Sequence, residues 1–419
     1  MDQFEIVGGR KIKGTVKISG SKNAALPCLF ATLLTDEPCQ LDHVPQLDDI
    51  DIAIKLLVVL GKQVTRDRDQ VVITHGTNLT GKAPYELVRR MRASVLVMGP
   101  LLARMGRARV SLPGGCAIGA RPINYHLEGF KRMGVKIEIE EGYVKAGCDS
   151  LKGAVISLPY PSVGATENLM MAAALAKGET VIQKAAREPE IVDLGRMLMG
   201  MGVPIEGLGS SRIKITGVST LSGVNHRVIP DRIETGTFLI AAAVTKGDLT
   251  LKGVDLSHLD DVVQVLRKSG LSIKEVEGGV RARWVKKLKP IDVATAVYPG
   301  FPTDMQAQWI ALMSVIPGRC RVRETVFENR FLHVQELFRF GADIHLDGRD
   351  AIIHGGTHLS GCSVMASDLR AGAALVLAGL AAKGKSTILR VYHLDRGYEQ
   401  MEVKLRKCGA QIRRTNPVK

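Results

Sequence analysis

The sequence predicts an α/β protein of two domains, each built from three copies of a βαβαββ-like unit. The chain has 419 residues, which suffices for two or three domains at roughly 150 residues each. Short segments centred on glycine also recur at an even spacing of 68 to 73 residues. Such a period indicates six structural repeats that fill the chain. The recurring glycines are Gly61, Gly134, Gly202, Gly270, Gly341 and Gly409.

Within each repeat, the residue pattern predicts the elements in order. An Ala-rich helix comes first, as in residues 23–26 and 371–375, and a strand led by glycine follows, as in residues 178–182. Apolar residues at helical spacing, as in residues 262–266, then predict a second helix that ends at the recurring glycine, a C-cap position. Alternating apolar and polar residues, as in 135–139, predict the strands that close the unit.

The repeats are expected to share cores, because a unit of this size buries too little apolar surface to be stable alone. Three units in each of two domains is the simplest grouping, and it places the break near residues 223–230. Clefts between domains are preferred ligand sites. We therefore expect the functional site between the two groups of repeats.

Composition favours a cytoplasmic enzyme over other classes of protein. The longest strongly apolar stretch, residues 371–382, is shorter than the roughly 18 residues of a membrane-spanning helix, and the acidic start lacks the basic region of a signal peptide. Seven scattered cysteines without a C-x-x-C pair indicate reduced thiols, with neither disulfides nor a zinc site. We therefore expect no membrane partner and no metal.

A net charge of +15 could serve nucleic acid, an anionic membrane surface or small anionic substrates. Aromatic residues make up only 4%, and no run of Lys and Arg reaches five residues. The chain therefore has few aromatic residues on which nucleic-acid bases could stack, and it has no long basic segment that could bind the phosphate backbone. Small anionic substrates fit the charge best.

Two motifs that suggest other cofactors fail on their context. Residues 379–386 match the phosphate-loop pattern G-x-x-x-x-G-K-[ST], but that motif requires a strand before it and a helix after it, and the order here is reversed. His354 and His358 have the i, i+4 spacing of metal ligands, but Gly355 and Gly356 between them break a helix. We expect neither ATP binding nor a metal site at these places.

Residues 112–122 interrupt one unit with turn-forming residues and place Cys116 five residues from Arg121. A mobile Gly-rich loop can close over a ligand, and a nearby cation lowers the pKa of a thiol towards its reactive form. The alternative interpretation is a surface loop whose cysteine has no function. Local chemistry alone leaves both interpretations open.

Several helix starts carry groups suited to an anion. Lys22 with Asn23, and residues 162–166, open helices whose free N–H groups suit phosphate, although simple capping by Ser and Thr explains them more economically. Charged residues recur at equivalent helix starts of the last three units, and their recurrence favours a shared anion site. These are Asp231, Arg232, Glu234, Asp304, Arg330, Asp368, Arg370, Asp395 and Arg396.

Taken together, these strings resemble the UDP-N-acetylglucosamine enolpyruvyl transferase family from end to end. The strings are residues 19–27, the Cys116 loop, and residues 186–191, 230–236, 301–306 and 327–331. The resemblance implies inside-out α/β barrels with pseudo-threefold symmetry, an active site in the interdomain cleft, and a first strand that crosses into the C-terminal domain. The expected domains are residues 22–229, and residues 1–21 with 230–419.

By this resemblance the enzyme would move the enolpyruvyl group of phosphoenolpyruvate to the 3-hydroxyl of UDP-N-acetylglucosamine and release phosphate, the first committed step of peptidoglycan synthesis. It implies no cofactor and no metal. The methylene carbon must gain a proton and later lose one, so an acid and a base are both required. The resemblance makes Cys116 the proton donor, the group that forms a covalent adduct and the target of the epoxide fosfomycin, and Asp304 a base at the sugar hydroxyl.

The binding residues also follow from the resemblance. For phosphoenolpyruvate they are Lys22, Asn23, Arg121, Arg330, Arg370 and Arg396. For UDP-N-acetylglucosamine they are Asn23, Arg92, Arg121, Pro122, Ile123, Asn124, Tyr125, Ser162, Val163, Gly164, Asp304 and the backbone of Val326. Asn124 stands where the family often has Asp, and Tyr160 with Pro161 stands where some members have Lys, so the sequence departs from the family only beside the expected uracil.

Three alternatives come from different classes of function. The shikimate-pathway enolpyruvyl transferase shares the repeats but lacks the cysteine loop. A nucleic-acid-binding protein would use the positive charge without the aromatic residues that it needs. A non-catalytic regulatory paralogue would not need both Cys116 and Asp304, which are present here.

Overall fold

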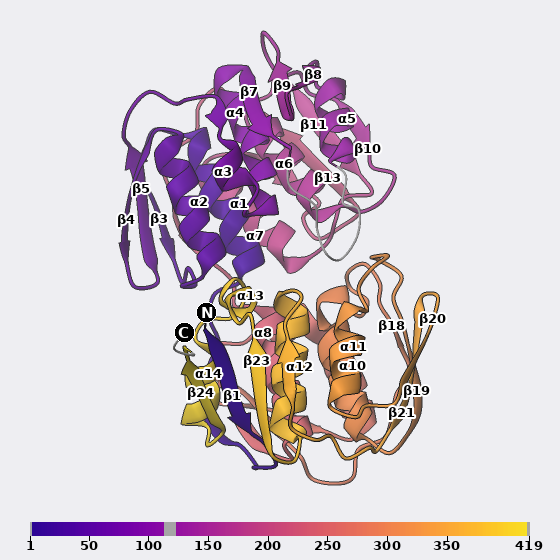
Figure 1. The fold of residues 1–419 in the computed structure, drawn as a ribbon. Coiled ribbons are helices and arrows are strands. Elements are labelled where there is room, and N and C mark those ends of the chain that lie inside the picture. Colours follow the sequence, from indigo (N-terminus) through magenta and orange to yellow (C-terminus); the bar gives the residue numbers. More distant parts are fainter. Residues whose placement is uncertain (1, 113–122, 417–419) are drawn as a thin grey trace. The chain divides into compact units, whose positions relative to one another are not determined.

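The computed structural model describes residues 2–112 and 123–416, and the chain divides into two compact units (Figure 1). The unit that we call the N unit comprises residues 20–112 and 123–229. The C unit comprises residues 2–19 and 230–416. Each unit has its own hydrophobic core, and the described residues form three four-stranded sheets in each.

The N unit begins at the first Ala-rich helix and ends with a short strand. In chain order its elements are α1 (Lys22–Ala31), η1 (Thr32–Leu34), β3 (Cys39–Asp42), α2 (Asp48–Val59), β4 (Lys62–Asp67), β5 (Gln70–His75), β6 (Lys82–Ala83), α3 (Tyr85–Val88), η2 (Arg92–Val97), α4 (Met98–Met105), β7 (Arg107–Ser111), α5 (Asn124–Arg132), β8 (Lys136–Glu140), β9 (Tyr143–Gly147), β10 (Val155–Ser157), α6 (Val163–Ala173), β11 (Glu179–Gln183), α7 (Pro189–Gly200), β12 (Ile205–Glu206), β13 (Arg212–Thr216) and β14 (Asn225–Arg227).

The C unit contains the first two strands of the chain and everything after β14. Its elements are β1 (Gln3–Val7), β2 (Lys13–Lys17), α8 (Arg232–Val244), β15 (Asp248–Lys252), η3 (Leu256–Leu259), α9 (Asp260–Ser269), β16 (Ser272–Val276), β17 (Gly279–Arg283), β18 (Val293–Ala294), η4 (Thr303–Met305), α10 (Gln306–Val315), β19 (Gly318–Arg323), α11 (Leu332–Arg339), β20 (Ile344–Asp347), β21 (Asp350–Gly355), β22 (Ser363–Met365), α12 (Leu369–Ala381), β23 (Lys385–Leu389), α13 (Tyr392–Asp395), α14 (Met401–Lys407) and β24 (Gln411–Thr415).

The predicted βαβαββ repeat is confirmed, and every sheet is built in the same way. In the sheet β10-β11-β13-β12, for example, the first pair of strands is parallel and the next two pairs are antiparallel. The chain runs from β10 through α6, β11 and α7 to β12 and β13. The six glycines that revealed the repeat all have positive φ values, between 90° and 114°, at the end of the second helix of their units. Glycine adopts this conformation without strain, so it serves as the C-cap.

Two repeats exchange their leading strands. β2 precedes α1 in the chain but pairs with β15 of the C unit, and β14 precedes α8 but pairs with β3 of the N unit. β1 in turn lies between β23 and β24 of the last repeat. Within residues 2–112 and 123–416, the chain therefore passes from one unit to the other at residues 19–20 and 229–230.

Three Ala-rich or apolar helices, α8, α10 and α12, pack together inside the C unit. Almost every residue of each helix is buried, which agrees with the lack of a polar face. Charged groups singled out in the sequence lie at or just before their starts: Arg232 in α8, Asp304 before α10 and Arg370 in α12. The phosphate-loop match has the reversed context that we predicted, because α12 ends at Ala381 and β23 begins at Lys385.

Candidate functional site

In the C unit, the structure brings together three of the residues that the sequence indicates. Asp304 lies in η4, just before α10, and Arg370 is the second residue of α12. One carboxylate oxygen of Asp304 lies 2.6 Å from Nη2 of Arg330, and the other lies 2.9 Å from Nη2 of Arg370. The Nε of Arg370 adds a bond of 3.2 Å, so this guanidinium binds in a forked manner.

In this cluster, burial and the neighbouring positive charges act in opposite directions on the pKa of Asp304. The exposed fractions of Arg330 and Arg370 are only 7% and 3%, whereas the side chain of Asp304 is 28% exposed. Burial by itself raises the pKa of Asp304, but the charges of Arg370 and Arg330 outweigh it and hold the pKa well below its usual range. Nη1 of Arg370 is buried without a hydrogen-bond partner in the described part of the chain.

Glu324, which sequence reasoning missed, organises the residues around this cluster. Its exposed fraction is 1%, and one oxygen accepts bonds from the hydroxyl of Thr295 and from the N–H groups of Val326 and Phe327, at 2.8 to 3.1 Å. The other oxygen accepts a bond of 2.8 Å from Thr303, whose hydroxyl in turn accepts one from Arg330. One carboxylate thus connects the segments that carry Val326 and Asp304.

Arg396 differs from its predicted place at a helix start. It lies directly after α13, at that helix's C-cap, and α14 begins only at Met401. Gln400 has a φ of 48°, so the chain turns between the two helices. The string 395–399 therefore forms a connection, not the first turn of a helix.

The N unit holds most of the described residues of the predicted nucleotide-sugar site, mostly at helix starts, whereas Asp304 and Val326 lie in the C unit. Lys22 is the first residue of α1, is 8% exposed, and lies 3.3 Å from a carboxylate oxygen of Asp49. Asn23 follows it in α1, and Arg92 is the first residue of η2. The hydroxyl of Ser162 caps α6 by accepting a bond from the N–H of Ala165, so the capping interpretation is confirmed there.

A small hollow lies beside the predicted nucleotide residues. Its volume is about 310 Å³, and it is lined by Asn124 and Tyr125 at the start of α5 and by residues 156–159. Ile123, just before α5, is buried. Val163 and Gly164, predicted for the same ligand, form the first turn of α6.

Hydrogen bonds of His126 and Asn168, two residues that the sequence analysis did not single out, connect α5 and α6 to η2 and α4. The side-chain amide of Asn168 donates bonds of 3.0 Å to Nδ1 of His126 and to the carbonyl of Val95, and its oxygen accepts one of 2.7 Å from Gly99. Burial, and after it the charge of Arg92, lowers the pKa of His126 to about 3. The imidazole is therefore neutral and acts as an acceptor. No local motif marks either residue, because their partners are distant in the sequence.

Cys116, Arg121 and Pro122 lie outside the described residues, as does the rest of 113–122. Their predicted roles stay predictions. Asp304, Val326, Arg330 and Arg370 lie in the C unit, whereas Lys22, Asn23, Arg92 and residues 123–125 and 162–164 lie in the N unit.

The comparisons with known proteins decide the family. A model of the family described as EPSP synthase (3-phosphoshikimate 1-carboxyvinyltransferase) matches residues 6–405. The chain belongs to this family. A curated member from Endomicrobium trichonymphae, a UDP-N-acetylglucosamine 1-carboxyvinyltransferase, is 56% identical over 99% of both chains. One of the same name from Lawsonia intracellularis is 53% identical over 99% of this chain and 100% of its own.

Solved structures of an enolpyruvyl transferase and of an EPSP synthase share the fold over almost the whole chain. The enolpyruvyl transferase NikO from Streptomyces tendae has a TM-score of 0.90 at 26% identity, covering 99% of each chain. An EPSP synthase from Acinetobacter baumannii has a TM-score of 0.77 at 18% identity and covers 99% of this chain and 100% of its own. The predicted α/β class of repeats is therefore confirmed.

One buried group in the described residues has donors suited to a metal. Ligand atoms of Cys28, Asp193 and His226 lie within 4.8 Å of one another. Asp193, however, already accepts a bond of 3.0 Å from His226, and burial raises the pKa of Cys28 well above its usual value. A protonated thiol is a poor ligand, so the group is better explained as a hydrogen-bonded core. As for membranes, the described helices include none that is both long and apolar enough to cross one.

Proposed function

We propose that this protein transfers the enolpyruvyl group of phosphoenolpyruvate to the 3-hydroxyl of UDP-N-acetylglucosamine, with release of phosphate. The observation that carries the proposal is full-length identity of 52–56% to enzymes named for this reaction. The cluster of Asp304, Arg330 and Arg370 supports it, since it supplies buried cations for an anionic substrate and a carboxylate beside them.

Asp304 can act as a base only when its arginines are engaged elsewhere. A carboxylate whose pKa is held this low is a weak proton acceptor. If the carboxylate of phosphoenolpyruvate binds Arg370 and Arg330 in place of Asp304, Asp304 loses part of the positive charge that stabilises its ionised form. Its pKa then rises. Substrate binding would thereby activate the base beside the sugar hydroxyl.

The acid and the remaining contacts complete the proposal. Cys116 would protonate the methylene carbon, the sugar hydroxyl would then attack, and loss of a methyl proton with phosphate would restore the enol. Lys22, Asn23, Arg121 and Arg396 would hold phosphoenolpyruvate. The nucleotide sugar would be bound by Asn23, Arg92, residues 121–125 and 162–164, Asp304 and Val326.

We also propose that the two units act as domains, residues 22–229 and residues 1–21 with 230–419, and that the active site forms between them. The passages of the chain at residues 19–20 and 229–230 support this division. A role in peptidoglycan synthesis in the cytoplasm follows from the proposed reaction. No cofactor is required by this chemistry.

The alternative acceptor is shikimate 3-phosphate, which the description of the matching family model names. Phosphate release from phosphoenolpyruvate should be measured with each acceptor in turn. We expect turnover with UDP-N-acetylglucosamine and none with shikimate 3-phosphate, and Asp304→Ala serves as the inactive control. The reverse acceptor preference would refute the proposal, and no release with either acceptor would favour a non-catalytic paralogue.

A further inference from the structure

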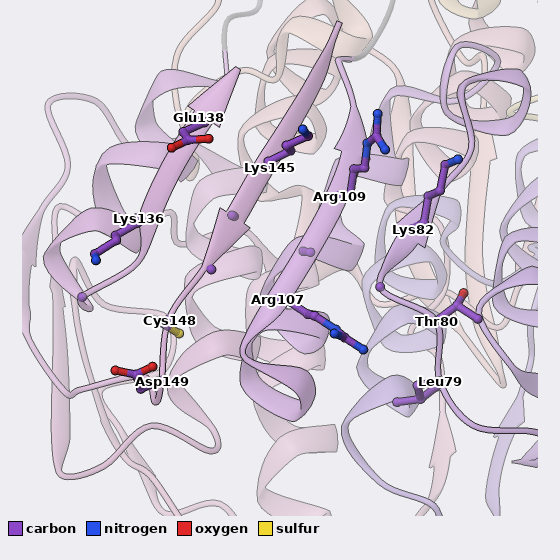
Figure 2. A pocket seen from close by; sticks show the side chains of 15 residues that line it. Leu79, Thr80, Lys82, Arg107, Arg109, Lys136, Glu138, Lys145, Cys148 and Asp149 are labelled. Carbon is purple, nitrogen blue, oxygen red and sulfur yellow. The ribbon is translucent and has the colours of Figure 1, made fainter. Parts of the chain in front are cut away.

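The larger of the hollows described in the structure lies away from every residue assigned to the substrates. It has a volume of about 860 Å³ and lies on the outer face of the sheet β6-β7-β9-β8 in the N unit. Figure 2 looks onto this face, where Glu138, Lys145, Arg109 and Lys82 form a row across the four strands. Its lining includes five cationic side chains, Lys82, Arg107, Arg109, Lys136 and Lys145, but only two acidic ones.

Strand alternation and one glycine create the hollow. Ala108 and Ala146 point into the core, so the residues next to them point outward. Gly147 pairs with Arg107 on one side and with Lys136 on the other. Because Gly147 has no side chain, the floor between these two cations is bare backbone.

Neither packing nor backbone conformation requires glycine at position 147. A Cβ added there would come no closer than 3.9 Å to any other group, and its φ does not lie in the left-handed region. Glycine in a strand weakens the strand, and it often marks a place where a ligand approaches the backbone. Glycine at this position leaves the backbone of the hollow's floor open to a ligand.

The charges around Gly147 are not balanced within the protein. Arg109 pairs with Glu141 at 3.1 Å, and Lys145 pairs with Glu140. No ion pair joins Lys82, Arg107 or Lys136 to another described residue. In the row across the sheet, Arg109 lies directly opposite Lys145 and next to Lys82, and like charges in such positions repel. Glu138, opposite Lys145 on its other side, offsets only part of this positive charge. A bound anion would relieve this repulsion.

The spacing of the cations indicates the class of ligand. Arg107 and Lys136 stand two strands apart, roughly 10 Å between backbones, so one small anion cannot contact both fully. The lining holds no aromatic residue and only Leu79 as a large apolar one, so it offers neither a stacking platform for bases nor an anchor for a protein partner. We propose that this hollow binds a small molecule carrying at least two phosphate groups, with Arg107 and Lys136 on either side of Gly147.

Pyrophosphate is the probe, and its binding to the full-length protein should be measured by calorimetry. We expect Gly147→Thr, which fills the hollow, and the double variant Arg107→Ala/Lys136→Ala each to weaken binding at this site by about tenfold or more, the scale of lost charge-assisted bonds. Gly147→Ala, whose single methyl group leaves most of the hollow open, should bind nearly as the wild type does. Turnover should not change, because none of these residues contacts the proposed substrates.

The control removes the same charge elsewhere. Lys17→Ala/Lys274→Ala takes two exposed lysines from the sheet β16-β17-β15-β2 of the C unit, and binding should stay within about twofold of the wild type. Equal binding by all variants, or equal loss in this control, would overturn the proposal. A hexaglutamate peptide tests the other source of negative charge. If it binds more tightly than pyrophosphate and Gly147→Thr abolishes its binding, the ligand is an acidic protein segment and the proposal is wrong.

Discussion

At the scale of single residues, two buried guanidinium groups lower the pKa of one carboxylate, that of Asp304. Asp304 shares its oxygens between Arg330 and Arg370, and each arginine is almost fully buried. Removing the carboxylate would leave two buried cations close together without their shared ion-pair partner, which is costly in a protein interior. Asp304 is therefore expected to matter both for catalysis and for the stability of the C unit.

Asp304→Asn should lower turnover by about 10² or more, the usual scale for a positioned base. It should also change the response to acid. The pKa of Asp304 is depressed in the folded state, so its stabilisation is complete above the unfolded value of about 3.9 and is lost as pH falls towards the folded value. Unfolding measured between pH 6 and 2 should therefore depend less on pH in the variant. An equal acid response in both proteins would argue against the ion pairs.

The cysteines differ in their expected reactivity. Burial raises the pKa of all six described thiols, and that of Cys320 rises to about 12. A protonated thiol is a poor nucleophile. Only Cys116, outside the described residues and five positions from Arg121, is expected to be reactive.

Treatment with fosfomycin should therefore yield one adduct, on the peptide that contains Cys116, when the protein is analysed by mass spectrometry. Cys116→Asp keeps a proton-transfer group but removes the soft nucleophile, so it should stay active and resist the epoxide. Cys116→Ser should be less active, since a hydroxyl is a poor acid near neutrality. Labelling of several cysteines, or rapid inactivation of Cys116→Asp, would make Cys116 an ordinary surface thiol.

At the scale of elements, short connections place the functional groups and buried polar side chains hold those connections. Glu324 joins the segment of Val326 to η4, which carries Asp304. Asn168 of α6 joins His126 of α5 to the backbone of η2 and α4. Each hydrogen bond contributes modestly, but an unmade one in a buried site costs more. Loss of one such partner should disturb several segments together.

Glu324→Gln tests this positioning role. One oxygen becomes an NH₂ group, which cannot accept the bond from Thr303, so Arg330 and Asp304 should shift. We expect kcat to fall by about tenfold, the scale of one buried bond to a charged group, with a smaller change in KM for UDP-N-acetylglucosamine. Thr303→Val should act similarly, and the double variant should show less than the product of the two effects.

Glu277→Gln is the matched control, because it removes one acidic charge from an exposed turn of the same unit. It should leave kcat unchanged. If Glu324 has a purely structural role, Glu324→Gln should lower the melting temperature without lowering kcat of the folded enzyme. If the effects of Glu324→Gln and Thr303→Val on kcat multiply, the two residues do not act through one hydrogen-bond chain.

At the scale of the whole molecule, six equal repeats form two units with separate cores, and the predicted substrate contacts are divided between them. Lys22, Asn23 and Arg92 belong to the N unit, whereas Val326 and the cluster of Asp304, Arg330 and Arg370 belong to the C unit. If the proposed active site forms between the units, cations of both units would face one another there, and an anionic ligand between them would offset their repulsion. Ligand binding is therefore expected to bring the units together.

Small-angle scattering should show a smaller radius of gyration when UDP-N-acetylglucosamine is added. Arg92→Ala, which weakens the proposed nucleotide contact, should require more ligand for the same change. An unchanged radius at saturating ligand would contradict closure, even if turnover is normal.

The repeat and its elements could be predicted from the sequence because they depend on local patterns. A glycine at each C-cap, apolar residues at helical spacing and alternating strands are all set by backbone geometry over a few residues. Recurrence of these patterns gave the number of units, and recurrent charges at helix starts indicated Asp304, Arg330 and Arg370. Arg396 was misplaced because a turn through Gln400 separates α13 from α14.

Only the tertiary structure decided which distant segments meet. The pairing of β14 with β3, the bonds of Glu324 and Asn168, and the bare backbone at Gly147 all join residues far apart in the chain or on different strands. Such pairings depend on how whole sheets and helices pack, and they leave no local period in the sequence. The chain's own pattern thus determined the repeating fold and the chemistry at helix starts, whereas packing determined how these groups are held and where a second anion would bind.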